Sequence, residues 1–234
     1  MKVALFVLLA WLPGLVSAVC ERPLIVAAEH WPPYAEKVDE RWTGIDVQQV
    51  RAILAAVGCE AVFTDIPPER SHLLLERGEI DLLMAASDVP ARHRYAWFTL
   101  PYRQEVQAVF AISGTKDLPS DFFGFRDSEL TLIAPRAGWY GDDYAAVRDE
   151  LMASDRLLTF DYTRQALTML AAGRGHLVMG DQQSMLLVAQ QMKLSIEQRW
   201  VANDAPVHLM LSRHSVSEAL VQRINEVLTS KAQP

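Results

Sequence analysis

Residues 79–102, EIDLLMAASDVPARHRYAWFTLPY, decide which fold the rest of the chain is expected to form. The apolar run 80–85 predicts a short strand, and the small residues that end it let a ligand approach the backbone. Ser87 and Arg92 follow, and a hydroxyl and a guanidinium five residues apart at a strand end can grip one carboxylate together. The competing interpretation is a strand, a turn and an arginine in a surface ion pair, because such pairs are common.

The residues before this stretch alternate between strand and helix patterns. Apolar residues from Ile45 to Val57 recur at helical spacing, and Gly58 suits the end of that helix. The expected elements are a turn at 42–44, strands 24–28, 60–64 and 80–85, and helices 45–57 and 68–77. This β-α-β-α-β order predicts a parallel sheet covered by helices.

A second unit with the same order follows. Its expected elements are an irregular segment 113–129, strands 130–134, 157–160 and 176–180, and helices 142–152, 163–172 and 182–192. Strands 105–112 and 207–211 would join the two units, and an amphipathic helix at 215–228 would end the chain. We therefore predict a two-lobed α/β fold, with two parallel or mixed sheets flanked by helices and a two-strand hinge. The predicted segments are 1–18 (signal peptide), 19–108 (lobe 1), 109–206 (lobe 2) and 207–234 (return strand and last helix of lobe 1).

The first residues have the pattern of a secretory signal peptide. Lys2 precedes an apolar run over 3–12, and small residues surround Ala18, where we expect cleavage. The run is too short for a membrane-spanning helix. A lipoprotein anchored at Cys20 would need a small residue before it, and Val19 stands there. The expected location is the periplasm, with no stable membrane insertion.

The composition excludes several classes of partner and chemistry. The formal net charge is −7, and loss of Lys2 would make it more negative, which argues against nucleic acid and anionic membranes as partners. The six histidines show no metal-ligand spacing, and no motif typical of hydrolases, metalloproteases or nucleotide-binding enzymes is present. We expect a monomer without cofactor, metal or catalytic residue.

The chain has two cysteines, Cys20 and Cys59, each just before a predicted strand. If those strands are parallel neighbours, both cysteines lie at the same sheet edge and can form a disulfide in an oxidising compartment. Two free thiols are the alternative.

Polar and aromatic residues follow the predicted strands of both units. In open parallel sheets, ligands bind beyond the carboxyl ends of the strands. The candidates at such ends are Glu29, Trp31, Tyr34, Ala85, Ser87, Arg92, Arg136, Trp139, Tyr140 and Asp181. For Trp31 the alternative is a plug that packs its loop onto the strand, and for Asp181 it is an ordinary cap of the next helix.

These candidates divide by charge. Ser87 and Arg92 of the first lobe, with the amide groups at 138–140 beside a helix start in the second, would form an anion site. Arg136 would lie on the second-lobe side with these amide groups. Asp181, Glu29 and the carbonyl of Ala85 would form a cation site. An α-amino acid carries both charges on one carbon, so paired sites of opposite sign suit it. Closure of the two lobes would remove water from such a ligand.

The chain resembles the family 3 periplasmic solute-binding proteins, the polar amino-acid receptors of ABC importers, over nearly all of its mature length. Residues 81–92 (DLLMAASDVPAR) and the ending Pro101-Tyr102 are similar to the family's first-lobe pattern. Residues 136–140 (RAGWY) and 170–181 are similar to its second-lobe patterns. The resemblance implies that Ser87 and Arg92 hold the ligand carboxylate and that Ala85 and Asp181 hold its amino group.

The sequence also departs from the family pattern. Val89 and Ala91 replace the usual Thr and Glu, His176 stands where an Asp is common, and Trp139-Tyr140 are bulkier than usual. The predicted function is capture of an amino acid or related carboxylate for an ABC importer. The alternatives are a prephenate/arogenate-type dehydratase on the same fold, with Glu29 or Asp181 as general acid or base, and a periplasmic sensory module that docks a membrane receptor.

Overall fold

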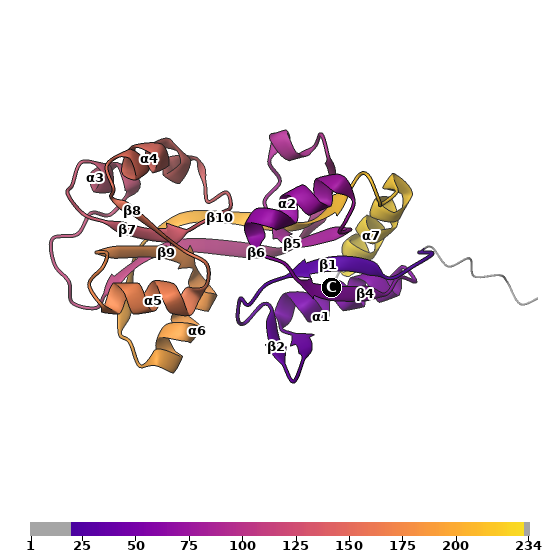
Figure 1. The fold of residues 1–234 in the computed structure, drawn as a ribbon, viewed down its shortest axis with the longest axis horizontal. Coiled ribbons are helices and arrows are strands. Elements are labelled where there is room, and N and C mark those ends of the chain that lie inside the picture. Colours follow the sequence, from indigo (N-terminus) through magenta and orange to yellow (C-terminus); the bar gives the residue numbers. More distant parts are fainter. Residues whose placement is uncertain (1–19, 232–234) are drawn as a thin grey trace, which may run out of the picture.

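Two long antiparallel strands, β6 (Ala96–Ile112) and β10 (Ile196–Ser212), run side by side through both lobes of the molecule (Figure 1). The computed structural model describes residues 20–231, so the predicted signal peptide lies outside the described part of the chain. The two lobes share one eight-stranded sheet in the order β4-β1-β5-β10-β6-β9-β7-β8. The long strand pair therefore belongs to both lobes and connects them.

The first lobe places three parallel strands beside the long pair. They are β1 (Leu24–Ala28), β4 (Ala61–Asp65) and β5 (Leu82–Ala86). Helices α1 (Ile45–Ala56) and α7 (Glu218–Lys231) pack in one hydrophobic cluster with Leu82, and α2 (Pro68–Arg77) packs in another with Leu83. Because neighbouring strand residues point to opposite faces, the apolar run in β5 is covered on both sides.

The second lobe repeats this arrangement. Its strands are β7 (Leu132–Pro135), β8 (Leu157–Phe160) and β9 (Leu177–Asp181). Helices α5 (Thr163–Ala171) and α6 (Gln182–Met192) cover the face of Val178, and α3 (Phe122–Arg126) and α4 (Asp142–Ala153) cover the face of Leu177. The predicted two-lobed α/β fold is confirmed, but the two predicted sheets form one continuous eight-stranded sheet, because β6 and β10 run through both lobes. The predicted boundaries between the lobes, at 108/109 and 206/207, lie inside the continuous strands β6 and β10. The exact residues at which the chain passes from one lobe to the other therefore stay a prediction.

Several elements differ from the prediction. β6 begins at Ala96 rather than near residue 105, and β10 begins at Ile196 rather than 207. Each added stretch contains a proline, Pro101 or Pro206, and proline is unfavourable inside a strand because it lacks a ladder donor. The pairing of β6 with β10 is irregular at several points, and one of its register shifts lies between Val207 and His208, next to Pro206.

Two short elements were not expected. The hairpin of β2 (Glu36–Val38) and β3 (Arg41–Thr43) occupies part of the predicted turn at 42–44. α3 interrupts the segment 113–129 that was expected to be irregular, and Asp121 caps it by accepting from the amide of Gly124 at 2.7 Å. Both elements are too short to produce a clear period in the sequence.

A disulfide joins Cys20 and Cys59 with a Cα–Cα distance of 5.3 Å, as predicted. It forms because β1 and β4 are parallel neighbours, so the residues that precede both strands meet at one edge of the sheet. Within residues 20–231, no helix combines the length and the apolar character needed to span a bilayer.

Asp81 fixes the start of β5. Its buried carboxylate accepts from both terminal nitrogens of Arg22 at 2.6 and 2.7 Å, from the amide of Ile25 at 2.7 Å and from the hydroxyl of Ser215 at 2.6 Å. The Asp therefore ties β5 to β1 and to the segment that leads into α7. These contacts anchor the start of β5, the strand whose other end carries the cleft residues Ala85 and Ala86.

Candidate functional site

A cleft with a volume of about 230 Å³ opens between the lobes at the carboxyl ends of the strands. Nine of the ten predicted ligand residues line it: Glu29, Trp31, Ala85, Ser87, Arg92, Arg136, Trp139, Tyr140 and Asp181. The tenth, Tyr34, lies behind this lining. The placement of functional residues at strand ends thus brings the candidates together, and their role in binding stays a prediction.

Arg92 contributes a guanidinium without an acidic partner. It ends the short 3₁₀ turn Pro90–Arg92, and its Nη1 donates to the carbonyl of Ser87 at 3.0 Å. Within the described residues it forms no ion pair, and burial lowers its pKa. The nearby His72 stays neutral, because burial and the charge of Arg92 lower its pKa to about 4. Arg92 is therefore a partly buried cation that is free to bind an anion.

Arg136 is held in a different way. Its Nε contacts Asp161 at 2.6 Å and Glu69 at 3.2 Å, and its Nη2 donates to Asp161 at 3.2 Å. Glu69 belongs to α2 in the first lobe, whereas Arg136 and Asp161 follow β7 and β8 in the second. The hydrogen bond from Arg136 lowers the pKa of Asp161. This exposed cluster links the lobes across the cleft instead of presenting a free cation.

Asp181 caps α6 and also faces the first lobe. Its Oδ1 accepts from the amide of Ser184 at 2.8 Å, and its Oδ2 accepts from the hydroxyl of Tyr34 at 3.2 Å. The side chain is buried, and burial raises its pKa. The alternative interpretation of Asp181 as a helix cap is therefore correct, and the same carboxylate also lines the cleft. Tyr34 thus supports Asp181 from across the lobes.

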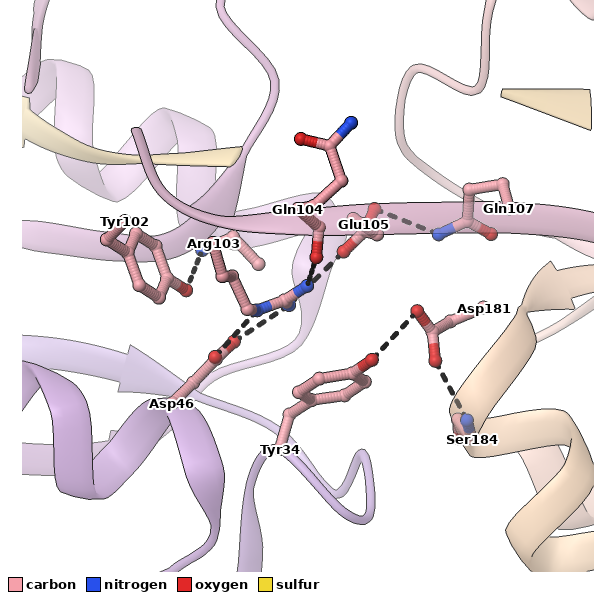
Figure 2. A network of polar contacts seen from close by, with 10 residues as sticks. Tyr34, Asp46, Tyr102, Arg103, Gln104, Glu105, Gln107, Asp181 and Ser184 are labelled. Carbon is pink, nitrogen blue, oxygen red and sulfur yellow. Dashed lines mark hydrogen bonds and ion pairs between the residues drawn. The ribbon is translucent and has the colours of Figure 1, made fainter. Parts of the chain in front are cut away.

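A polar network that the sequence did not reveal surrounds this contact (Figure 2). Arg103 on β6 forms a two-pronged pair with Asp46 at 2.8 and 2.9 Å, and its Nη2 lies 3.3 Å from Glu105. Its guanidinium carbon lies 4.1 Å from the centre of the Tyr34 ring. Gln107 donates from Nε2 to Glu105 at 2.9 Å. The predicted strand began only near residue 105, so no sequence signal placed Arg103 beside the cleft.

Glu29 is a second carboxylate without a cationic partner among the described residues. Burial raises its pKa to about 7, and the nearby charges of Glu69, Asp65 and Asp161 add to this effect. It follows β1 directly and lines the cleft. A ligand cation beside Glu29 would favour its charged form.

The remaining candidates shape the cleft wall. Ala85 has a positive φ of 50°, and its amide donates to the hydroxyl of Tyr102 at 3.0 Å. Tyr140 folds back over Gly138, whose φ is 130°, and donates to the carbonyl of Ala137. The Tyr140 hydroxyl donor is used by this bond, its oxygen can still accept, and a role of Tyr140 in binding stays a prediction.

The described residues contain no cluster of three or more His, Cys, Asp or Glu side chains placed to hold a metal ion. The cleft contains more carboxyl groups than its arginine side chains neutralise. Six carboxylates line the cleft: Glu29, Asp46, Glu69, Glu105, Asp161 and Asp181. Arg103 and Arg136 account for four of them, and Arg92 is left to face Glu29 and Asp181. The site can therefore bind one anionic group together with one or two cationic groups.

Comparison with known proteins identifies the family of the chain. The family model "Bacterial extracellular solute-binding proteins, family 3" matches residues 24–233. No curated protein matches the chain.

Solved structures share the fold at low sequence identity. Holo ArgBP from T. maritima has a TM-score of 0.74 and 16% identity, with 91% of each chain covered. A histidine kinase sensor domain similar to periplasmic binding proteins has a TM-score of 0.76 and 19% identity, with 90% of each chain covered. An ancestral amino acid-binding protein, described as a precursor of cyclohexadienyl dehydratase, has a TM-score of 0.72 and 17% identity, with 89% of this chain and 88% of that chain covered. The fold is of the type II periplasmic binding class, and the chain belongs to the bacterial extracellular solute-binding proteins, family 3.

Proposed function

We propose that this protein captures an amino acid in the periplasm by closing its two lobes and delivers it to an ABC importer. Family membership supports a small-molecule ligand, and the predicted signal peptide supports export. The cleft volume of about 230 Å³ suits a small molecule rather than a peptide.

One observation carries the proposal: a cation without an acidic partner and two carboxyl groups without a cationic partner face the same cleft. Arg92 has no acidic partner, and Glu29 and Asp181 have no cationic partner, among the described residues. A ligand with a carboxylate and an ammonium group completes the pairing of Arg92 and Asp181. Removing water from these groups is favourable only when each charge meets its opposite.

The remaining carboxylate indicates the ligand's side chain. With Arg92 and Asp181 paired, Glu29 still lacks a cation, so the charges favour an amino acid with a positively charged side chain. An arginine-binding protein among the structural neighbours makes L-arginine a suitable first probe. Trp31, which also lines the cleft, offers an aromatic face for such a cation.

Thermal unfolding with added ligand tests the proposal, because a ligand that binds only the folded state raises its unfolding temperature. We expect stabilisation by L-arginine and L-lysine. Three fragments of arginine separate the contacts: agmatine lacks the carboxylate, 5-guanidinopentanoate lacks the α-amino group and L-norvaline lacks the guanidinium. Each should bind more weakly than L-arginine. If none of the twenty amino acids raises the unfolding temperature, the proposal is overturned.

The same-fold dehydratase is supported by one observation, the Glu29 pKa of about 7, since a general acid or base works best near the operating pH. Incubation with prephenate or arogenate, followed by NMR, tests it directly. We expect no turnover. Product formation that is lost in Glu29→Gln would favour the enzyme instead.

A further inference from the structure

Gln107, on β6 at the floor of the cleft, has an unused acceptor. Its side chain is only 4% exposed, and its Nε2 donates to Glu105 Oε2 at 2.9 Å. Its Oε1 is buried and has no hydrogen-bond partner within the described residues, although Gln107 lines the cleft. Buried polar atoms are normally paired, so an unpaired one on a residue that lines a binding cleft makes that residue a candidate ligand contact.

The orientation of this amide is fixed by its neighbour. Rotation of the amide by half a turn would place Oε1 against the Glu105 carboxylate, which also lies 3.3 Å from Arg103. Two oxygens that both carry negative charge repel, so the amide nitrogen faces Glu105 and the oxygen points away from it. Figure 2 shows this arrangement, with Asp181 close to Gln107 on the neighbouring strand.

Gln107 and Asp181 are direct partners in the β6–β9 ladder, so their side chains lie on the same face of the sheet. Each carboxylate oxygen of Asp181 already accepts one hydrogen bond, from Ser184 or from Tyr34. A primary ammonium has three N–H donors and needs several acceptors to replace water. The Oε1 of Gln107 can supply an additional hydrogen-bond acceptor for such an ammonium group beside the carboxylate of Asp181.

We propose that Gln107 is a specificity-determining ligand contact whose Oε1 accepts a hydrogen bond from the ligand's α-ammonium group beside Asp181. The inference rests on the proposed function, because it requires an amino acid in the cleft. It predicts that the cleft selects primary amines over analogues that lack the amine, through a residue on the strand that connects the lobes.

The test compares Gln107→Met with Gln104→Met by calorimetry. Methionine keeps the length of glutamine and removes the acceptor. Gln104 is a matched control, because it is an exposed glutamine on the same strand that bonds to Asp204 at 2.7 Å and does not line the cleft. The probes are L-arginine and 5-guanidinopentanoate, which is arginine without its α-amino group. The affinity of the more weakly bound probe is measured by competition with the other.

For Gln107→Met, affinity for L-arginine should fall about tenfold or more, the usual effect of a hydrogen bond to a charged group, and affinity for 5-guanidinopentanoate should change less than about threefold. Gln104→Met should bind both probes as the wild type does. Equal losses for both probes, or no loss for L-arginine, would overturn the inference alone. Failure of the wild type to bind L-arginine would overturn the proposed ligand class and the inference with it. If Gln107→Met does not fold, Gln107→Asn withdraws the same oxygen and should give the same pattern.

Discussion

Arg92 and Arg136 were both predicted to line the ligand site, and they occupy different environments. Both lie just beyond a strand end, on opposite walls of one cleft. Arg92 is partly buried and donates only to the Ser87 carbonyl, whereas Arg136 is exposed and held by Asp161 and Glu69. The first is a cation in need of an anion, and the second is already neutralised.

The difference shows what a strand-end position does and does not determine. Topology brings an arginine to the cleft, but the residues around it decide whether its charge is available. Asp161 follows β8 and Glu69 lies in the first turn of α2, and neither residue was among the predicted site residues. We therefore propose that the ligand carboxylate binds Arg92 and that Arg136 serves as a link between the lobes.

Arg92→Ala should have the largest effect. Removal of one partner of a desolvated charge pair costs about 2–5 kcal/mol, so affinity for L-arginine should fall about 30-fold or more. Arg94→Ala is the control, because Arg94 is exposed and pairs with Glu76 at 3.1 Å. If calorimetry finds that Arg92→Ala binds L-arginine as tightly as Arg94→Ala does, the proposed difference between Arg92 and Arg136 is wrong.

Binding should also depend on pH through Glu29. In the empty cleft its pKa is about 7, and a bound cation favours the carboxylate, so binding releases a proton below that pH. Affinity for L-arginine should rise about tenfold from pH 6 to pH 8 and then level off. Glu29→Gln should bind more weakly and lose this pH dependence. A flat profile in the wild type would show that no ligand cation lies near Glu29.

Glu29 should affect the stability of the ligand-free protein as well. Its folded-state pKa of about 7 lies above the ordinary value of 4.5, so its favourable contribution is complete below pH 4.5 and is lost as pH rises through 7. At pH 8, Glu29→Gln should therefore raise the free energy of unfolding by about 1–3 kcal/mol, with little difference at pH 4. Denaturant unfolding at both pH values measures this, and a variant that is less stable at pH 8 would contradict it.

Tyr34→Phe should have an intermediate effect. It removes the 3.2 Å hydrogen bond to Asp181 and leaves the ring under Arg103 in place. A hydrogen bond of this kind contributes about 1 kcal/mol, so affinity for L-arginine should fall about fivefold. An unchanged affinity would mean that Asp181 does not need support from the first lobe.

Arg136→Ala should have the smallest effect. Exposed ion pairs contribute little, so affinity for L-arginine should change less than about threefold at physiological salt. The change should shrink further in 0.5 M NaCl, because salt screens exposed charges. A loss as large as that of Arg92→Ala would place the ligand carboxylate at Arg136.

The sequence was sufficient for the parts of this molecule that follow from local patterns. Periodic apolar residues predicted the α/β units, and the strand-end rule gathered nine of the candidate residues in one cleft. The Cys20–Cys59 disulfide followed from the parallel order of two strands.

Long-range pairing could not be obtained in the same way. Pro101 and Pro206 hid the true length of the hinge strands, and with it the position of Arg103. The partners of Arg136 and Arg103 come from segments far apart in the chain, and no local spacing announces such pairs. Whether a charge is free or satisfied is therefore a property of the folded structure.

A crystal structure of the protein with L-arginine tests the central distinction most directly. We predict that the ligand carboxylate lies within 3.2 Å of the Arg92 guanidinium, a hydrogen-bond distance, while Arg136 keeps its contacts with Asp161 and Glu69. A ligand carboxylate bound to Arg136, with Arg92 making no contact to it, would contradict the account.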